Sequence, residues 1–203
     1  MSIIIRAAQR PDADAIAAAH TSGWRVGYRG LFPDEYLDSD QFANDHAAMW
    51  CQWTWNGAND DRGARLFVAE HNGAVIGFGT VGPERDQPSC HIDADVVVAT
   101  PPIPRGELYA FYLHADAWGT GAAAPLLQTC QQALIESGFS SAVLWVLRDN
   151  PRARAFYEKM GWTPTGETEE WTDSRAPIHL QAPVTEFQYF IHLLEFERRT
   201  TDT

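Results

Sequence analysis

The chain has 203 residues, of which 45% are hydrophobic and 21% are charged, and its formal net charge at pH 7 is −12. This length and composition are ordinary for a soluble globular protein, so we expect one domain over residues 1–203, with its core in roughly 3–193 and a polar C-terminal tail. The acidic excess opposes general nucleic-acid binding, which needs Lys and Arg on the phosphates, and no apolar run approaches the roughly 20 residues of a membrane span.

The N-terminal quarter predicts one strand and three helices. Residues 3–5 are three isoleucines and indicate a strand. A helix begins near Pro11, because the carboxylates that follow it suit the positive end of the helix dipole, and its pattern breaks over residues 23–30. A short helix opens at residues 32–35, and a longer one is expected over about 40–55.

A hairpin is predicted next. Strand-like runs at residues 66–70 and 75–81 are joined through Asn72-Gly73, a strong hairpin signal. Residues 56–63 and 83–88 read as loops. The stretch from His91 to Ala99 either extends the hairpin strand or forms an excursion, and the prolines after it exclude regular structure: Pro101, Pro102 and Pro104.

The central strand is the apolar run 108–113, and a turn with Gly119 and Gly121 follows it. Glycines let backbone N–H groups approach a ligand, because no Cβ blocks the way. The next helix adds unpaired N–H groups and a partial positive charge at its start. The turn therefore predicts a phosphate or pyrophosphate site.

That helix carries apolar residues at helical spacing and stops at Gly138. Pro125 lies near its start, so either the helix begins later than Thr120 or its second turn is distorted. Residues 142–147 are apolar throughout, as buried parallel strands are. 

A last helix is predicted with Asn150 as N-cap, Pro151 at its first position and Gly161 as its stop. Strands over 162–170 and 184–193 complete the chain and flank a loop.

Two motifs in this order resemble the GNAT-type N-acetyltransferases, which bind acetyl-CoA. That family's pyrophosphate motif is Arg/Gln-x-x-Gly-x-Gly/Ala, and here Trp118 takes the first place while the small-residue positions are Gly119, Gly121 and Ala123. The later motif is Asn-x-x-Ala-x-x-Phe/Tyr-Tyr-x-x-x-Gly-Phe, matched by Asn150, Ala153, Phe156, Tyr157, Gly161 and Trp162. The resemblance is clear over roughly residues 105–165. It implies an α/β fold: a single GNAT-like domain with a mixed six- to seven-stranded sheet, about four flanking helices, and central strands that splay near Leu113.

The resemblance also implies acetyl-CoA as co-substrate and no metal. The backbone of the central strand and the glycine turn would hold the cofactor, with help from the second motif; the residues are Tyr112, Leu113, His114, Trp118, Gly119, Thr120, Gly121, Ala122, Ala123, Asn150, Ala153 and Phe156. Because Trp118 replaces Arg or Gln, phosphate binding must rely on backbone groups, with three arginines as candidate helpers: Arg148, Arg152 and Arg154.

Two residues are carried over as catalytic. Tyr157 would protonate the departing thiolate; the alternative is a core tyrosine whose hydroxyl bonds the backbone. Glu107, at the start of the central strand, is either a base or a structural carboxylate, and His114 and His20 are alternatives for the base.

The acceptor site is less well defined. Residues 20–37 look like an N-terminal helical region that covers part of the acceptor site in one branch of the family, so Trp24 and Tyr28 are candidate substrate-binding residues. Residues 32–61 contain seven carboxylates and neither Lys nor Arg. This run is either a solvated acidic face or a surface that attracts a cationic amine.

The function expected is transfer of an acetyl group from acetyl-CoA to a primary amine of a small molecule or peptide by direct attack. A homodimer is compatible with these features. The alternative is a non-catalytic acyl-CoA-binding or sensory domain on the same fold. A Rossmann nucleotide-binding domain fits poorly, because the full Gly-x-Gly-x-x-Gly pattern is absent.

The cysteines and the N-terminal residues indicate the cellular compartment of the protein. The start of the chain lacks the basic flank and long apolar centre of a signal peptide. Three widely spaced cysteines, Cys51, Cys90 and Cys130, fit neither a disulfide framework nor a metal site. We therefore expect reduced core thiols in a cytoplasmic protein.

Overall fold

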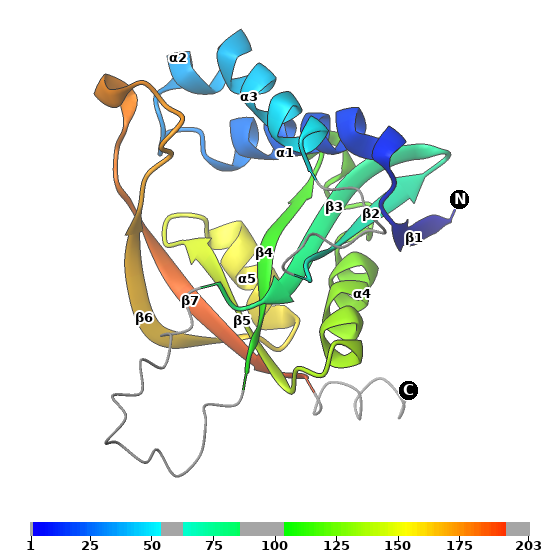
Figure 1. Ribbon diagram of the computed structural model, residues 1–203. Helices are drawn as coiled ribbons and strands as arrows, with labels where there is room; N and C mark the ends of the chain where they lie inside the picture. The colour runs from blue at the N-terminus through cyan, green and yellow to red at the C-terminus, as the bar shows by residue number, and fades with distance from the viewer. Residues whose placement is uncertain (1, 54–62, 86–103, 194–203) are drawn as a thin grey trace, which may run out of the picture.

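The structure is a computed structural model that describes residues 2–53, 63–85 and 104–193. Within these ranges one seven-stranded sheet runs through the molecule in the order β1-β2-β3-β4-β5-β7-β6 (Figure 1). All neighbouring strands are antiparallel except β4 and β5, which are parallel. The strands are β1 (Ile3–Ala7), β2 (Arg65–His71), β3 (Ala74–Pro83), β4 (Gly106–Leu113), β5 (Ser141–Leu147), β6 (Thr163–Trp171) and β7 (Val184–His192).

Helices cover both faces of this sheet (Figure 1). The described residues form five α-helices, each at a position where the sequence predicts one, and short 3-10 turns at Arg10–Asp12, Ala115–Ala117 and Ile178–Leu180. The helices are α1 (Ala13–Gly27), α2 (Asp34–Leu37), α3 (Asp40–Cys51), α4 (Ala123–Glu136) and α5 (Pro151–Lys159). The predicted α/β fold with a mixed six- to seven-stranded sheet is thereby confirmed.

The two faces have separate cores. The apolar side of α4, with Leu126 and Leu134, shares one cluster with Tyr157 of α5. On the opposite face, Ile16 of α1 packs near Trp50 of α3 in a second cluster. A third cluster joins α1 and α2 to the end of β5; it contains Trp24, Phe32, Tyr36, Leu37, Phe42, Leu147 and Ala176. The N-terminal helices therefore cover the end of the sheet at which β5 stops.

The central strands separate, as predicted, but sooner than expected. Parallel pairing of β4 with β5 covers only Gly106–Leu108 and Ala142–Leu144. The separation thus begins directly after Leu108 rather than near Leu113. The register of β3 against β4 shifts between Thr80 and Val81, at the same level of the sheet. An irregularity of this kind bends a strand, and here it accompanies the divergence of β4 from β5.

Helix α1 corrects one expectation. The predicted break over residues 23–30 begins too early, because the helix continues through Gly23 and ends at Gly27. A Cβ atom at Gly23 would lie 3.0 Å from Cδ1 of Tyr112 and 3.4 Å from the carbonyl oxygen of Leu113. Gly23 therefore lets α1 approach β4 closely, at the level where β4 has left β5.

Several local signals are confirmed. Asn72 and Gly73 adopt positive φ angles of 53° and 80° in the hairpin between β2 and β3. The Asn150 side chain accepts a hydrogen bond from the N–H of Ala153 and caps α5. Helix α4 begins at Ala123, so Pro125 lies in its first turn, where no intrahelical N–H bond is lost. Helix α3 ends at Cys51, earlier than expected, and Trp55 lies outside the described residues, as do the stretch 91–99 and most of the loop 56–63.

The cysteine expectation holds in part. Cys130 is fully buried beneath the sheet, but Cys51, the last residue of α3, is exposed and is not a core thiol. Cys90 lies outside the described residues. No helix within the described ranges is long and apolar enough to cross a membrane.

Candidate active site

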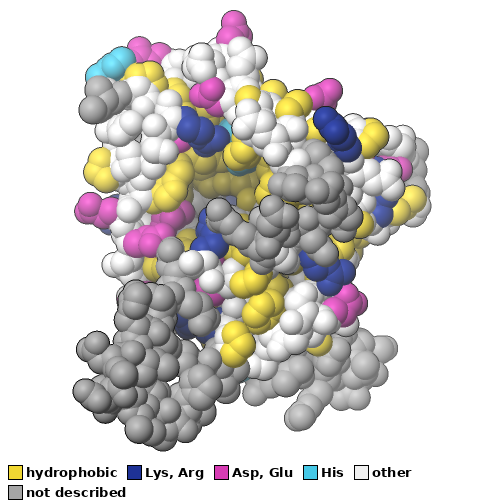
Figure 2. Space-filling view, in the orientation of Figure 1, with side chains coloured by type: hydrophobic (Ala, Val, Ile, Leu, Met, Phe, Trp, Pro, Cys, Tyr) yellow, Lys and Arg dark blue, Asp and Glu magenta, His cyan; other side chains and the backbone are white. Residues whose placement is uncertain are grey.

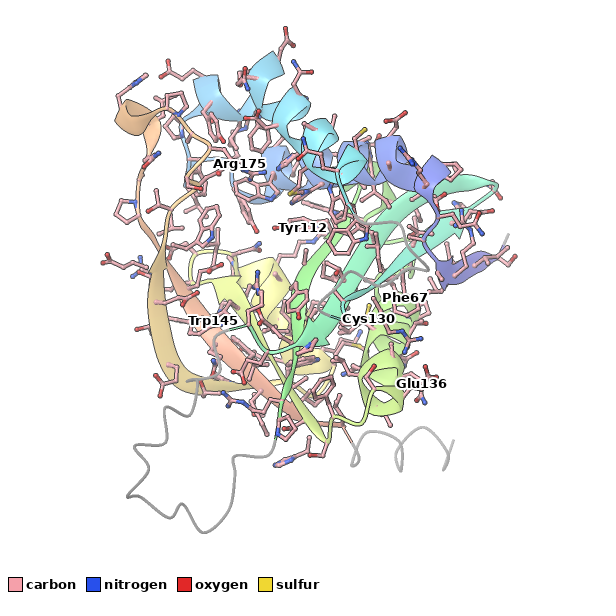
Figure 3. The ribbon with its side chains drawn as sticks, in the orientation of Figure 1. Phe67, Tyr112, Cys130, Glu136, Trp145 and Arg175 are labelled. Atoms are coloured by element: carbon pink, nitrogen blue, oxygen red, sulfur yellow. The ribbon has the colours of Figure 1, made fainter. Side chains whose placement is uncertain are left out.

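A cavity of about 1470 Å³ lies where β4 and β5 separate. It exceeds the roughly 300–1,000 Å³ of common small-molecule sites, so it has room for a long cofactor together with a second substrate. Figure 2 shows a hollow with an apolar floor and charged side chains along its border. Figure 3 labels Tyr112 of β4, Trp145 of β5 and Arg175 of the segment after β6, which all line this cavity.

At one end lies the glycine turn. Gly119 and Gly121 have φ angles of +83° and +88°, which side-chain-bearing residues rarely adopt. No described residue accepts a hydrogen bond from the N–H groups of this turn and the following helix start, namely those of Gly119, Gly121, Ala122, Ala123 and Ala124. Unpaired N–H groups at the start of a 14-residue helix are suited to bind an anion.

Trp118 supports a cation at this turn. The guanidinium carbon of Arg152 lies 4.0 Å from the centre of the Trp118 ring, and both residues line the cavity. The indole N–H of Trp118 donates to the carbonyl oxygen of Leu113 at 3.2 Å, which fixes the ring. The other two candidate arginines are engaged elsewhere: Arg148 pairs with Asp149, while Arg154 bonds to Tyr189 and to the carbonyl of Arg148. 

The open edge of β4 presents backbone groups to the cavity. The N–H of His114 donates to the carbonyl oxygen of Ile76 on β3 at 2.8 Å, so it is not free for a ligand. Because successive N–H groups of a strand point to alternate sides, those of Phe111 and Leu113 point away from β3, into the gap. The N–H of His114 is thus paired within the sheet, and the N–H groups that face the gap are those of Phe111 and Leu113.

Tyr157 of α5 is one of the residues that line the cavity. Its side chain is buried with 7% exposure, and its hydroxyl makes no hydrogen bond to any described residue. Burial first, and then Tyr112 and Cys130, raise the pKa of Tyr157 above the ordinary value for tyrosine. The hydroxyl is therefore protonated at neutral pH.

Glu107 has a different setting. Its carboxylate accepts hydrogen bonds from Nε of Arg85 at 3.0 Å and from the backbone N–H of Arg85 at 2.9 Å, and its exposure is 3%. It does not line the cavity. Of the two readings of Glu107, this geometry favours the structural carboxylate.

The two histidines considered as bases are also poorly suited. His20 lines the cavity, but its Nδ1 accepts a hydrogen bond from Nε1 of Trp50 at 3.2 Å, which assigns the proton of the neutral ring to Nε2. Burial, with help from His46, lowers the pKa of His20 well below its ordinary value. His114 does not line the cavity, and its Nδ1 faces the N–H of Asp116 at 3.3 Å.

The other end of the cavity is aromatic. The ring centres of Trp24 in α1 and of Tyr28, the residue directly after α1, lie 4.6 Å apart, and the ring centre of Trp171 in β6 lies 5.5 Å from that of Trp24. The Tyr112 hydroxyl binds the Tyr28 hydroxyl at 3.0 Å and accepts from Nε1 of Trp24 at 3.0 Å. Trp24 and Tyr28, predicted to bind substrate, thus line the cavity together with Trp171, which sequence reasoning missed.

The acidic run 32–61 does not face this pocket. None of its carboxylates within the described residues lines the cavity. Asp34 and Asp38 are exposed, and both form ion pairs with Arg29. This observation favours the solvated acidic face over attraction of a substrate amine.

Most predicted site residues do meet in one place. Those that line the cavity are Trp24, Tyr28, Tyr112, Leu113, Trp118, Gly119, Gly121, Ala123, Asn150, Ala153, Phe156 and Tyr157. Four others do not: Glu107, His114, Thr120 and Ala122. Sequence reasoning missed Glu169, Arg175 and Glu186, and a carboxylate within the otherwise largely apolar run 184–193 was a signal for the last. No His, Cys, Asp or Glu cluster suited to a metal ion exists in the part of the chain that the structure describes.

Comparison with known proteins gives consistent results. Residues 25–162 match the model of the acetyltransferase (GNAT) family. An uncharacterized N-acetyltransferase of Bacillus subtilis is 30% identical over 150 residues, 73% of this chain and 74% of the relative. A probable N-acetyltransferase of Mycobacterium tuberculosis is 27% identical over 170 residues, 84% and 85% of the two chains.

Solved structures share the fold at lower identity. The PaiA N-acetyltransferase of Thermoplasma acidophilum, in complex with coenzyme A, superposes with a TM-score of 0.67 at 17% identity and covers 95% of this chain and 99% of its own. A putative acetyltransferase of Salmonella typhimurium with acetyl-CoA has a TM-score of 0.59 at 16% identity, with 95% of both chains covered.

Proposed function

Because this chain belongs to the acetyltransferase (GNAT) family, we propose that it moves an acetyl group from acetyl-CoA to a primary amine of a small molecule or peptide by direct attack of the amine on the thioester. One observation carries the proposal. A single cavity joins an anion site at the glycine turn, the open edge of β4, the Tyr157 hydroxyl and an aromatic pocket. These are the parts that binding and transfer of an acyl thioester require.

The glycine turn would hold the pyrophosphate. Its N–H groups supply donors, and Arg152, held over Trp118, supplies a positive charge beside them. The pantetheine arm would then run along the gap, where the N–H groups of Phe111 and Leu113 point away from β3. Binding of an extended chain to a free strand edge uses the same hydrogen bonds as a sheet.

Tyr157 would act when the tetrahedral intermediate collapses. The amine nitrogen bonds to the thioester carbon, the carbon–sulfur bond breaks, and the sulfur leaves with its electron pair. Donation of the Tyr157 proton to that sulfur avoids release of a bare thiolate. The raised pKa of Tyr157 does not oppose this role, because burial also raises the pKa of the neighbouring Cys130 thiol, and a thiolate formed in this cavity would be more basic for the same reason.

A non-catalytic acyl-CoA-binding domain is the second candidate. It would need the turn and the open strand edge, but neither a general acid nor a pocket for an acceptor. The Tyr157 hydroxyl, which bonds to no described residue, and the aromatic part of the cavity therefore support catalysis over binding alone. A panel of primary amines, incubated with acetyl-CoA and followed by thiol release and product mass, tests the proposal. Turnover of an amine supports it, whereas acetyl-CoA binding with no turnover on any amine supports the second candidate.

A further inference from the structure

Glu186 of β7 occupies an unusual position in the sheet. Its partners in the register are Leu147 of β5 and Glu169 of β6. Directly opposed residues on antiparallel strands project to the same face, so these three side chains form a row across the sheet. Leu147 packs in the cluster of Trp24, beneath the N-terminal helices. The two carboxylates therefore face that side, and both line the cavity.

This arrangement carries an electrostatic cost. Like charges directly opposite on neighbouring strands destabilise a sheet, and burial of a carboxylate costs free energy unless a partner compensates it. None of the described residues forms a hydrogen bond or ion pair with the Glu186 carboxylate. The cations that line this end of the cavity are engaged with other carboxylates, Arg85 with Glu107 and Arg175 with Asp173. This end of the cavity therefore favours a positively charged occupant.

Buried polar groups point to a ligand in the same space. His20 and Tyr157 are 6% and 7% exposed, and both line the cavity. The Nε2 of His20 and the hydroxyl of Tyr157 have no hydrogen-bond partner among the described residues. Burial first, and then Tyr112, raise the pKa of Tyr28, and the charges of Glu186 and Tyr157 add to that rise. Glu186 and Tyr157 thus act on the same hydroxyl from within one enclosure.

We propose that Glu186, flanked by Glu169, binds the acceptor nitrogen as an ammonium ion and takes from it the proton that must leave before attack. The acceptor is then a primary amine that is cationic in water and carries an aromatic or aliphatic group, not a carboxylate, next to the amine. The aromatic pocket of Trp24, Tyr28 and Trp171 would hold that group, and such rings also stabilise a neighbouring cation. This inference rests on the proposed function.

Every proton in the proposed transfer can be accounted for. The ammonium ion gives one proton to the Glu186 carboxylate, directly or through one water, and becomes a neutral amine whose lone pair attacks the thioester carbon. The carbon–nitrogen bond forms, the carbon–sulfur bond breaks, and the sulfur receives the proton of Tyr157. The nitrogen loses a second proton, which restores Tyr157 through solvent, and Glu186 releases its proton to solvent. One acetyl amide, one free thiol and one proton result.

The surroundings of Glu186 suit a base at neutral pH. Burial first, and then Glu169, raise the pKa of Glu186 to about 7; Glu107 adds to this rise and Arg85 opposes it. A general base is most effective when its pKa lies near the working pH. The ionised form is the active one, so kcat/KM is expected to rise with pH through about 7.

The test is Glu186→Gln, which removes the charge and keeps the shape, beside Glu170→Gln as matched control. Glu170 is exposed, opposes Thr185 and does not line the cavity. Loss of a general base typically costs about 10² to 10⁴-fold, so kcat/KM of E186Q should fall by that range and lose its rise with pH. E170Q should match the wild type, and calorimetry should show unchanged acetyl-CoA binding for both.

The outcomes separate the two proposals. If the wild type binds acetyl-CoA but acetylates no amine, the proposed function fails and this inference falls with it. If the wild type is active and folded E186Q keeps both its kcat/KM and its pH profile, Glu186 is not the base and the proposed function stands. 

Two further measurements test the inference even if the Glu186→Gln variant does not fold. Glu186→Asp keeps the carboxylate and should retain the rise with pH at a reduced rate. The wild type itself should prefer 2-phenylethylamine to phenylalanine, which differs by a carboxylate beside the amine. Preference for phenylalanine would overturn the inference.

Discussion

Replacement of Tyr157 by Phe removes one oxygen from a side chain that lines the cavity. The centre of the Tyr157 ring lies 5.5 Å from that of Phe156 and 6.3 Å from that of Trp162, and both contacts remain in the variant. The hydroxyl makes no hydrogen bond to any described residue, so its loss should change the free energy of unfolding by no more than about 1 kcal/mol. The melting temperature should therefore stay close to that of the wild type.

The effect on chemistry should be much larger. A positioned general acid contributes typically 10² to 10⁴-fold, so kcat should fall by about that factor, equivalent to about 3–5 kcal/mol of transition-state stabilisation. Acetyl-CoA affinity should fall far less, because the hydroxyl acts after binding. Steady-state kinetics, calorimetry and a melting curve on the same preparation measure these quantities. A single-turnover experiment isolates the chemical step from product release.

Tyr189→Phe is the matched control. Tyr189 is fully buried in the same core, but its hydroxyl bonds to Arg154 and Glu158 rather than to the cavity. This variant should lose stability and keep kcat, the reverse of the Tyr157 variant. A Tyr157→Phe enzyme with normal single-turnover rates would refute the assignment of the acid and leave Tyr157 as a packing residue.

Three other predictions follow from the site. Gly121→Glu places bulk and negative charge at a residue with a φ of +88°, so acetyl-CoA binding should be lost in calorimetry, and undiminished affinity would remove the pyrophosphate site from this turn. Arg152→Gln should weaken acetyl-CoA binding by about 10-fold or more, as for loss of a charged hydrogen bond, whereas Arg154→Gln should not; equal effects would contradict the role of Arg152. Burial alone would raise the pKa of Asp173, but hydrogen bonds, chiefly from Arg175, hold it below its ordinary value, so its stabilisation is present above about pH 4 and is lost as the pH falls through the lowered pKa. Asp173→Asn should therefore lower the melting temperature at neutral pH but not in acid, and a difference that persists in acid would argue against this linkage.

The elements set by neighbouring residues in the sequence were predictable. The hairpin at Asn72 and Gly73 needs positive φ angles that these two residues adopt readily. The cap of α5 depends on Asn150 and the N–H of Ala153, three residues away. Motif residues could be placed for the same reason, because each motif is one continuous stretch that folds as a turn or a helix.

The errors concern contacts between distant segments. Gly23 has the appearance of a helix break in sequence, yet its function is close packing of α1 against β4. Glu107 looks free in sequence because Arg85, its partner, lies 22 residues away. The pairing of Glu186 with Glu169 depends on the register of β6 and β7, and hydrophobic alternation alone did not predict that register.

The central claim is direct transfer of the acetyl group from acetyl-CoA to an amine, with both substrates bound in one cavity. Initial rates measured over a grid of acetyl-CoA and amine concentrations test it most directly. The account predicts reciprocal plots that intersect, an acetylated amine as product and no acetyl group on the protein. Parallel reciprocal plots together with an acetylated protein would contradict it, because they would show that the acetyl group passes through a covalent enzyme intermediate.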